Sequence, residues 1–472
     1  MSAPPGGIIG KLSVERPVLA NFLIAIGFVA LALAGVRAGG LDVSSLILNI
    51  VLAGIVVVLL PLSYLTLFPI SNWRNGVFAI TLLAGIATVS FVEIDVISNA
   101  ALILPRDWIL AGAGLGVLIA ALYPAVRGIL RLSVLAALTS IAAAAAASGF
   151  VGLNALALSE HTHLLVAIAA LTMTIGYGVG AGVAADFIKY FTNGATWRAA
   201  AVSAGHGGVA VSTFAIVMTA VTIAILSYHT NYQSIDWRFV WVGVTGTSLA
   251  VIGGLFSVSG GLALSTPSES VAEIENRKRR RFRYGWRPFR MALPPASALG
   301  SVLIVLVLAI LLVVEAGIPY AVIHAIFLAL VWISALVIFV SVRAATFIAL
   351  LLASAGVMSD GLFVMLDTPV DALEVRFIGF GFAAIFLSQL TLSWREARDN
   401  WHSARDVAEN ALSDGAGRFA LNTGVGIAVI YLVADVLAWS SGMDLVCYLA
   451  AMSFFSIALA PAFMTTLSMG ES

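Results

Sequence analysis

The segment LIVLVLAILLVV, from Leu303 to Val314, has no polar side chain and lies inside a longer apolar run. A helix needs about 20 such residues to cross a lipid bilayer, and comparable runs recur along the chain. Of the 472 residues, 61% are hydrophobic and only 10% are charged, whereas soluble domains carry about a quarter charged residues. The alternation of polar and apolar residues typical of barrel strands is not seen. The sequence therefore predicts an all-α, polytopic transmembrane helical bundle.

The apolar runs predict roughly fourteen spans at about 20 residues per crossing. In the first half the spans lie at about 17–36, 44–70, 75–96, 107–126, 131–155, 162–186, 203–228 and 238–264. In the second half they lie at about 295–316, 319–342, 344–366, 374–393, 418–438 and 444–467.

Positive charges indicate how these spans are oriented. With the N-terminus inside, the cytoplasmic loops receive most Lys and Arg residues, including the block NRKRRRFRYGWRPFR from Asn276 to Arg290. The opposite loops hold only Arg37, Arg106, Arg238 and Arg376. Because positive residues concentrate in cytoplasmic loops, both termini are predicted to be cytoplasmic, in a bacterial-type inner membrane. We interpret the basic block as an orientation signal and linker; the alternative is a patch that binds lipid or a partner.

The basic block divides the chain into two halves with a common pattern. We predict an N-terminal membrane half at 1–265, with inserted helices at about 44–96, a linker at 266–290 and a C-terminal membrane half at 291–472. Each half starts with Arg-Pro before a long span, and later has an amphipathic segment, a glycine cluster and a threonine just inside the membrane, Thr213 or Thr423. This order predicts two parallel pseudo-repeats related by an axis along the membrane normal.

Two long segments resemble a known family. They are RGILRLSVLAALTSIAAAAAASGFVGLNALALSEHTHLLVAIAALTMTIGYGVGAGVAADFIKYF and GAGRFALNTGVGIAVIYLVADV. They are similar to the membrane domain of the resistance-nodulation-division (RND) superfamily, which includes multidrug and lipid exporters. The resemblance implies a twelve-helix bundle, with the spans in 44–96 as two extra helices. The family's large extracytoplasmic domains are missing, since EAGIPYA (Glu315 to Ala321) fills one of their two places.

The family also carries a coupling acid near the middle of its fourth helix, after a glycine-rich run. Aligned on the glycines of MTIGYGVGAGVAADFIKYF, that position falls near Ala181. Aligned on the Asp-aromatic pair, Asp186 and Phe187 match it. A charge at mid-bilayer costs at least about 2.5–3.5 kcal/mol, and a position at a helix end beside Lys189 avoids most of this penalty. We interpret Asp186 and Lys189 as an interfacial pair; the alternative is a proton carrier.

Other polar residues in or near the spans are further candidates for ion coupling or transport. Asp360 and Asp435 lie close to the outer ends of their spans, where they either belong to an ion path or face the headgroup region. Thr213 and Thr423 complete this set. In the predicted tenth helix, Gln389 is the strongly polar residue near the place of a coupling acid.

The residues support no other chemistry. His161 and His163 could bind a metal, but further spaced ligands are not visible, so no metal site is predicted. The glycine run lacks the Gly-Lys-Ser/Thr ending of a phosphate loop, and no nucleophile–base set is visible, so neither a cofactor nor enzyme activity is expected. A net charge of zero argues against nucleic acid.

Two functions follow from the resemblance and the residues. The first is an RND-like inner-membrane transporter of a lipid or amphiphile, with protons as a driving ion. The second is a non-transporting membrane subunit or sensor that binds lipid or partner helices. Expected partners are membrane lipids, and membrane proteins or a second copy of the chain through helices 44–96.

Overall fold

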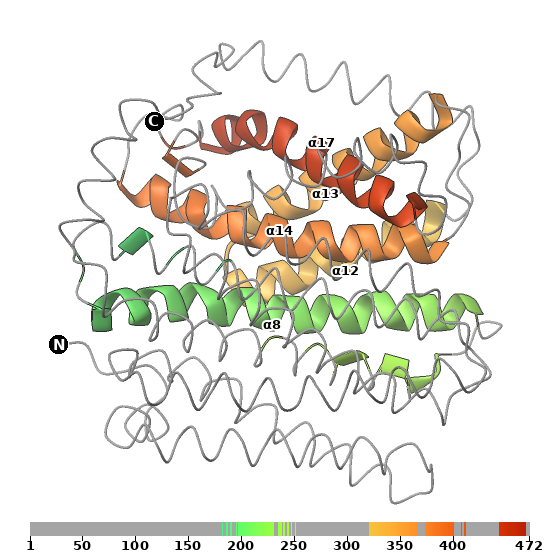
Figure 1. The fold of residues 1–472 in the computed structure, drawn as a ribbon, viewed down its shortest axis with the longest axis horizontal. Coiled ribbons are helices and arrows are strands. Elements are labelled where there is room, and N and C mark those ends of the chain that lie inside the picture. Colours follow the sequence, from blue (N-terminus) through green and yellow to red (C-terminus); the bar gives the residue numbers. More distant parts are fainter. Residues whose placement is uncertain are drawn as a thin grey trace, which may run out of the picture. The chain divides into compact units, whose positions relative to one another are not determined.

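The computed structural model describes residues 197–230, 321–365, 373–400 and 443–468, with single positions within 182–195, 235–251 and 407–411. Five helices lie in these ranges (Figure 1): α8 (Trp197–Thr230), α12 (Ala321–Phe339), α13 (Val342–Met365), α14 (Leu373–Asn400) and α17 (Met443–Ser468). The described part of the chain is all helical and contains no strand. The all-α prediction is confirmed for these residues.

Three helical segments within the described residues are long and apolar enough to cross a bilayer. They are Ala210–His229, Val342–Phe363 and Val375–Asp399, and Ile323–Phe339 and Cys447–Ser456 are shorter apolar helices. Length and composition therefore support a membrane protein. The twelve-helix, two-repeat arrangement, the inner membrane and the orientation of the termini stay predictions.

The chain divides into two compact units, Met1–Arg280 and Arg281–Ser472. α8 belongs to the first unit, and α12, α13, α14 and α17 belong to the second. The predicted linker at 266–290 and the inserted helices at 44–96 lie outside the described residues.

In the first unit, hydroxyl groups join α8 to the helical residues that follow it. Thr247 Oγ1 donates a hydrogen bond of 3.1 Å to Thr219 Oγ1, and Thr219 Oγ1 donates one of 3.0 Å to the Ala215 carbonyl. Gly243 faces Ile223 so closely that a Cβ atom there would collide with the Ile223 side chain. Small residues and interhelical hydroxyl bonds are the usual means of helix association in lipid.

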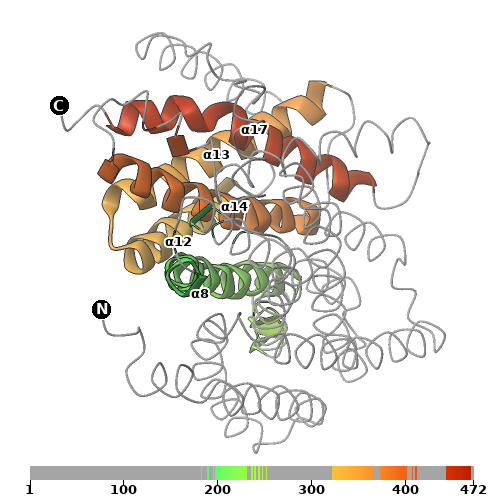
Figure 2. The ribbon, with the colours of Figure 1, turned by 60° about the vertical axis from the view of Figure 1, so that its left-hand side comes forward.

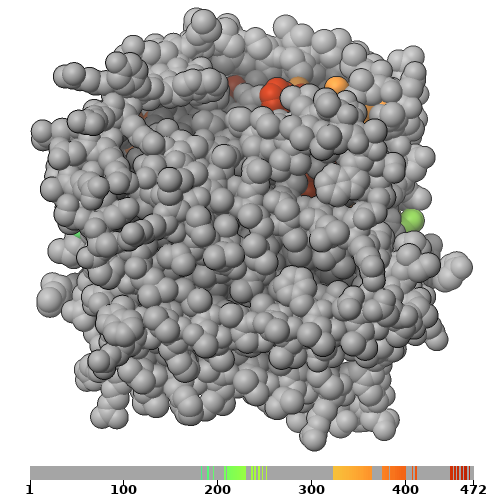
Figure 3. Space-filling model, viewed as in Figure 1, coloured from blue at the N-terminus to red at the C-terminus, as the bar shows by residue number. Residues whose placement is uncertain are grey.

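In the second unit, α13 packs against α12, α14 and α17, and α14 also packs against α17 (Figure 2). α14 is buried along almost its whole length. Figure 3 shows one face of the molecule, on which only a few atoms belong to the described residues.

One face of α12 is apolar and exposed. Ile326, Leu330, Ile333 and Val337 are each at least 36% exposed and follow one another at helical spacing along the helix. In a helix of a membrane protein such a stripe contacts lipid without loss, because lipid chains are as apolar as these side chains.

The turn between α12 and α13 combines one residue at positive φ with two hydrogen bonds. Val340 has a positive φ of 49°, which reverses the chain after the last residue of α12. Ser341 caps α13, because its Oγ accepts a hydrogen bond of 3.3 Å from the amide of Ala344. From α14, Arg395 Nη1 donates a hydrogen bond of 2.8 Å to the carbonyl of Phe339, the last residue of α12.

Aromatic side chains add contacts near the same turn. Trp332 Nε1 donates a hydrogen bond of 3.2 Å to Thr346 Oγ1, which joins α12 to α13. Trp394 is fully buried and stacks on Phe347 with ring centroids 5.4 Å apart, which joins α14 to α13. Near this turn, α13 is thus joined to both α12 and α14.

Candidate functional site

A single carboxylate among the described residues is buried inside the second unit. Asp360 is only 8% exposed and lies in α13, about one and a half turns before the helix ends at Met365. A buried charge must be paired or hydrogen-bonded, because the free energy of removing it from water is otherwise very unfavourable. The partners of Asp360 therefore define the site.

Arg376 supplies the opposite charge. It is the fourth residue of α14, is 8% exposed, and places its Nε atom 3.5 Å from Asp360 Oδ1. Among the described residues Nε makes no hydrogen bond, so the contact is an ion pair without well-aligned donation from Nε. The pair joins α13 to α14 and cancels both charges in an apolar environment.

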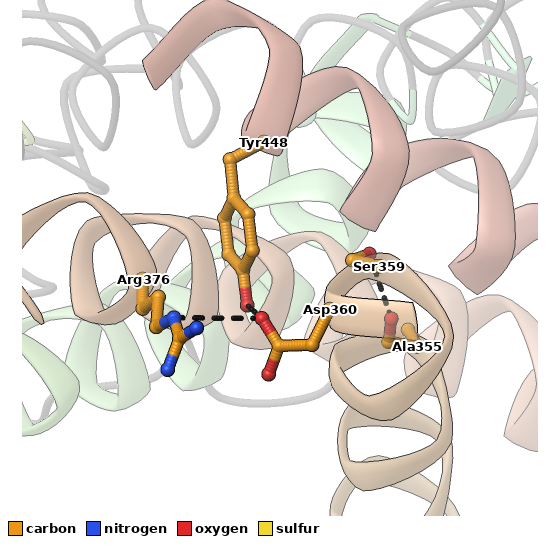
Figure 4. A network of polar contacts seen from close by, with 5 residues as sticks. All are labelled: Ala355, Ser359, Asp360, Arg376 and Tyr448. Carbon is orange, nitrogen blue, oxygen red and sulfur yellow. Dashed lines mark hydrogen bonds and ion pairs between the residues drawn. The ribbon is translucent and has the colours of Figure 1, made fainter. Parts of the chain in front are cut away.

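Tyr448 completes the group from a third helix. Its hydroxyl donates a hydrogen bond of 3.2 Å to Asp360 Oδ1, and its side chain is fully buried in α17 (Figure 4). The ring lies directly against α14 at Gly379, where a Cβ atom would lie 2.5 Å from Tyr448 Cδ1. We call Asp360, Arg376 and Tyr448 the Asp360 cluster.

Aromatic rings and a histidine lie beside the cluster. His324 of α12 stacks on Phe377 at 5.1 Å and meets the edge of Phe380 at 5.5 Å between ring centroids. Phe327 packs on the same two phenylalanines. His324 is also near enough to interact electrostatically with Asp360. Electrostatic interactions are stronger in such a low-dielectric environment than at a protein surface.

The arrangement can bind and release a proton at one position. The ionised Asp360 carboxylate attracts Arg376 and accepts a charge-assisted hydrogen bond from Tyr448. A protonated carboxyl group would lose the ionic attraction, and hydrogen bonds to neutral groups are about half as strong as charge-assisted ones. The contacts among α13, α14 and α17 thus depend on the charge of Asp360.

The other predicted site residues are described in part. Asp186 and Lys189 lie in a helical segment of the first unit, half-buried, and Lys189 Nζ is 5.3 Å from the centroid of the Tyr190 ring. The interfacial pair between them stays a prediction. Thr213 lies in α8 and is half-buried. Asp435, Thr423, His161 and His163 lie outside the described residues.

Two members of the Asp360 cluster were not identified from the sequence. The charge pattern placed Arg376 in an outer loop, which is wrong: the residue is buried in the first turn of α14, because Asp360 provides its counter-charge. Tyr448 had no visible signal. One feature of the sequence could have indicated this contact. Asp360 and Arg376 lie near the adjoining ends of two consecutive apolar runs.

No protein-family model matches the chain, and no curated protein sequence matches it significantly.

Proposed function

We propose that the protein is a membrane transporter of the RND-like type that moves a lipid or another amphiphile, and that a proton bound at Asp360 is its coupling ion. The observation that supports this proposal is the Asp360 cluster, a buried ionisable group held by three helices. Ionisable residues inside membrane helices are rare and mark ion or substrate pathways.

The cluster has the two properties that a coupling site requires. Asp360 exists in two charge states, and its partners come from two other helices, so each charge state favours a different contact between helices. A proton can drive motion only if it binds one arrangement more tightly than the other. Asp360 meets this condition because Arg376 and Tyr448 both stabilise the ionised form.

The proposal moves the coupling site from the first half of the chain to the second. The sequence placed Asp186 at a helix end beside Lys189. That placement neither supports nor contradicts a coupling site at Asp360. In the second half, α14 holds Ala383 to Phe386 and Gln389 where the family would carry an acid. Asp360 is an acid on the neighbouring helix α13, which packs directly on α14.

Transport and proton binding are tested on the full chain in lipid vesicles. The probe is a fluorescent phospholipid analogue, whose transfer between leaflets is followed under an imposed pH gradient. Asp360→Asn keeps the shape of the side chain and removes its charge. Asp399→Asn is the matched control, because Asp399 is an exposed acid on α14 whose side chain lies 3.7 Å from Arg398.

We expect gradient-dependent transfer by the wild type and by Asp399→Asn, and its loss in Asp360→Asn. Infrared difference spectra should show a protonated carboxyl band at acidic pH that is absent from Asp360→Asn alone. A folded Asp360→Asn variant that transfers the probe at the wild-type rate would refute the proposal.

A non-transporting subunit or sensor is the second candidate function. The specific observation in its favour is that Arg376 and Tyr448 already neutralise and bond Asp360, which is sufficient for a purely structural tie between helices. In that case Asp360→Asn lowers thermal stability, the protonated carboxyl band is missing from the wild type at every pH tested, and gradient-dependent transfer is absent from the wild type too.

A further inference from the structure

His324 lies near one end of α12 and only partly inside the second unit. It is the fourth residue of α12 and the second residue of the apolar segment Ile323–Phe339. At 1.5 Å rise per residue, it therefore lies about 4.5 Å from the start of the helix. The residue is half-buried, whereas its Nε2 atom is buried. His324 thus reaches from the surface of the second unit toward its interior.

The histidine ring belongs to a group of four aromatic side chains. It stacks on Phe377 and meets the edge of Phe380, and Phe327 packs on the same two rings with centroids 5.2 and 5.8 Å apart. The three phenylalanines are each at most 3% exposed. Phenylalanine cannot bind a proton, so His324 is the titratable member of this group. It is also the one titratable side chain in the sequence of α12.

Two consecutive contacts between α13 and α14 connect the aromatic group to Asp360. Arg376 and Phe380 are four residues apart on α14. Arg376 pairs with Asp360, and Phe380 lies against Gly356, where a Cβ atom would collide with the ring. Gly356 is four residues before Asp360, so the two share one face of α13, about 6 Å apart along the helix. His324 touches Phe380 and therefore lies beside this face.

The neighbours of Asp360 differ in their ability to deliver a proton. Arginine does not release its proton, and the tyrosine hydroxyl does so only near pH 10. Imidazole changes its charge between pH 5 and 8. Of the three titratable groups that interact with Asp360 in the described helices, which are His324, Arg376 and Tyr448, His324 is thus the suitable proton donor near neutral pH.

One oxygen of Asp360 is placed to accept the proton. Among the described residues, Arg376 and Tyr448 both contact Oδ1, and Figure 4 shows Oδ2 turned away from them. A proton on Oδ2 would leave both partners at their positions on Oδ1. The ionised carboxylate also attracts positive charge on His324, and this attraction is strong in apolar surroundings.

We propose that His324 is the relay through which a proton reaches Asp360. This inference rests on the proposed function, because it assigns the route of the proton that the function requires. The imidazole takes a proton from the aqueous phase at the end of α12. One N–H bond then breaks and one O–H bond forms at Asp360 Oδ2, directly or across one bridging water. His324 returns to its neutral form, and no other bond changes.

The test follows proton uptake by the full chain in lipid nanodiscs, where both faces of the membrane meet the same solution. The pH is lowered suddenly, and the rise of the protonated carboxyl band of Asp360 is followed by infrared spectroscopy. His324→Phe keeps a ring for stacking on Phe377 and removes both nitrogens. His324→Ala leaves a space that free imidazole can enter. His229→Phe is the matched control, because His229 is an exposed histidine near the end of α8.

We expect the band to rise about 10²-fold more slowly in His324→Phe and in His324→Ala, because a positioned proton carrier accelerates transfer by roughly 10²–10⁴-fold. The final band intensity at acidic pH should equal that of the wild type, since a relay changes the rate of protonation and not its extent. Added imidazole should restore fast uptake in His324→Ala but not in His324→Phe, whose ring fills the space. His229→Phe should match the wild type.

The outcomes separate this inference from the proposed function. If the wild type shows no protonated carboxyl band at any pH, the proposed proton site fails and the relay fails with it. If the band is present and rises at the wild-type rate in His324→Phe, the proton site stands and the relay is refuted. Slow uptake that imidazole leaves unchanged in His324→Ala would assign His324 a packing role alone and would also refute the relay. Faster uptake in His324→Ala than in the wild type would contradict it too.

Discussion

Tyr448 donates its hydroxyl hydrogen to Asp360 Oδ1 over 3.2 Å, although the two residues are 88 positions apart in the chain. The bond joins α17 to α13, and the Tyr448 ring also fills the space left by Gly379 on α14. One side chain thus contacts both neighbouring helices. The first two predictions concern this side chain.

Tyr448→Phe should lower stability while keeping the ring in place. The expected loss in the free energy of unfolding lies between about 0.6 kcal/mol, the average for interhelical bonds in membranes, and about 3 kcal/mol for a bond to a charged group. Unfolding in a denaturing-detergent titration measures it. Tyr228→Phe is the control, because Tyr228 is 43% exposed. Equal losses in both variants would contradict the role of the Asp360 bond.

Gly379→Ala should separate α14 from α17, since the new methyl group would lie 2.5 Å from the Tyr448 ring. Overpacking of this kind destabilises by about 1–3 kcal/mol. Replacing Tyr448 by Val should remove the clash, so the double variant Gly379→Ala/Tyr448→Val should lose less stability than the sum of the single variants. Strictly additive losses would show that the two residues do not meet.

Val340→Gly should stabilise the turn between α12 and α13. A side chain at positive φ is unfavourable by roughly 1–2 kcal/mol, and glycine avoids this strain at an entropic penalty of roughly 0.5–1 kcal/mol. The difference is a net gain of about 0–1.5 kcal/mol, which the same detergent titration measures. Val342→Gly is the control, because Val342 is also exposed but lies in the first turn of α13, where glycine should destabilise.

Arg395→Gln should destabilise the C-terminal end of α12, which comes directly before the same turn. The lost hydrogen bond to the Phe339 carbonyl involves a charged donor, and such bonds contribute about 1.5–3 kcal/mol. Because Arg395 is only half-buried, we expect the lower part of that range. Arg398→Gln, which disrupts an exposed pair with Asp399, should change stability by about 0–1 kcal/mol. Hydrogen exchange at the last turn of α12 should accelerate in Arg395→Gln alone.

Helix positions followed closely from the apolar runs. The runs at about 203–228, 344–366 and 444–467 correspond to α8, α13 and α17, whose bounds are Trp197–Thr230, Val342–Met365 and Met443–Ser468. Hydropathy depends only on each residue and its neighbours in the chain, so it can be evaluated from the sequence without knowledge of the fold. α14 extends beyond its run at 374–393 to Asn400, because a helix can leave the apolar region and continue with charged residues.

Only part of the candidate site could be predicted from the sequence. Asp360 could be identified because an ionised acid within an apolar membrane segment has an unfavourable free energy, whichever helices surround it. Arg376 was placed in a loop because counting positive charges assumes that they stay in water, and that assumption fails when a carboxylate on another helix provides a counter-charge. Tyr448 could not be found, since a tyrosine in an apolar run becomes a hydrogen-bond donor to an acid only through the packing partner it meets.

The sequence by itself determined that the described segments are helices and that several are apolar enough to cross a membrane. In lipid, the backbone of a long apolar segment must satisfy its own hydrogen bonds, and a helix does so within the segment. The tertiary structure alone decided which helices touch, and therefore which side chains meet Asp360. Helix association in lipid depends on close packing at positions such as Gly379 and on single polar contacts such as that between Arg376 and Asp360. Gly379 meets Tyr448 from a helix far along the chain, and Arg376 meets Asp360 only through the packing of α14 on α13, so the hydropathy pattern does not specify either contact.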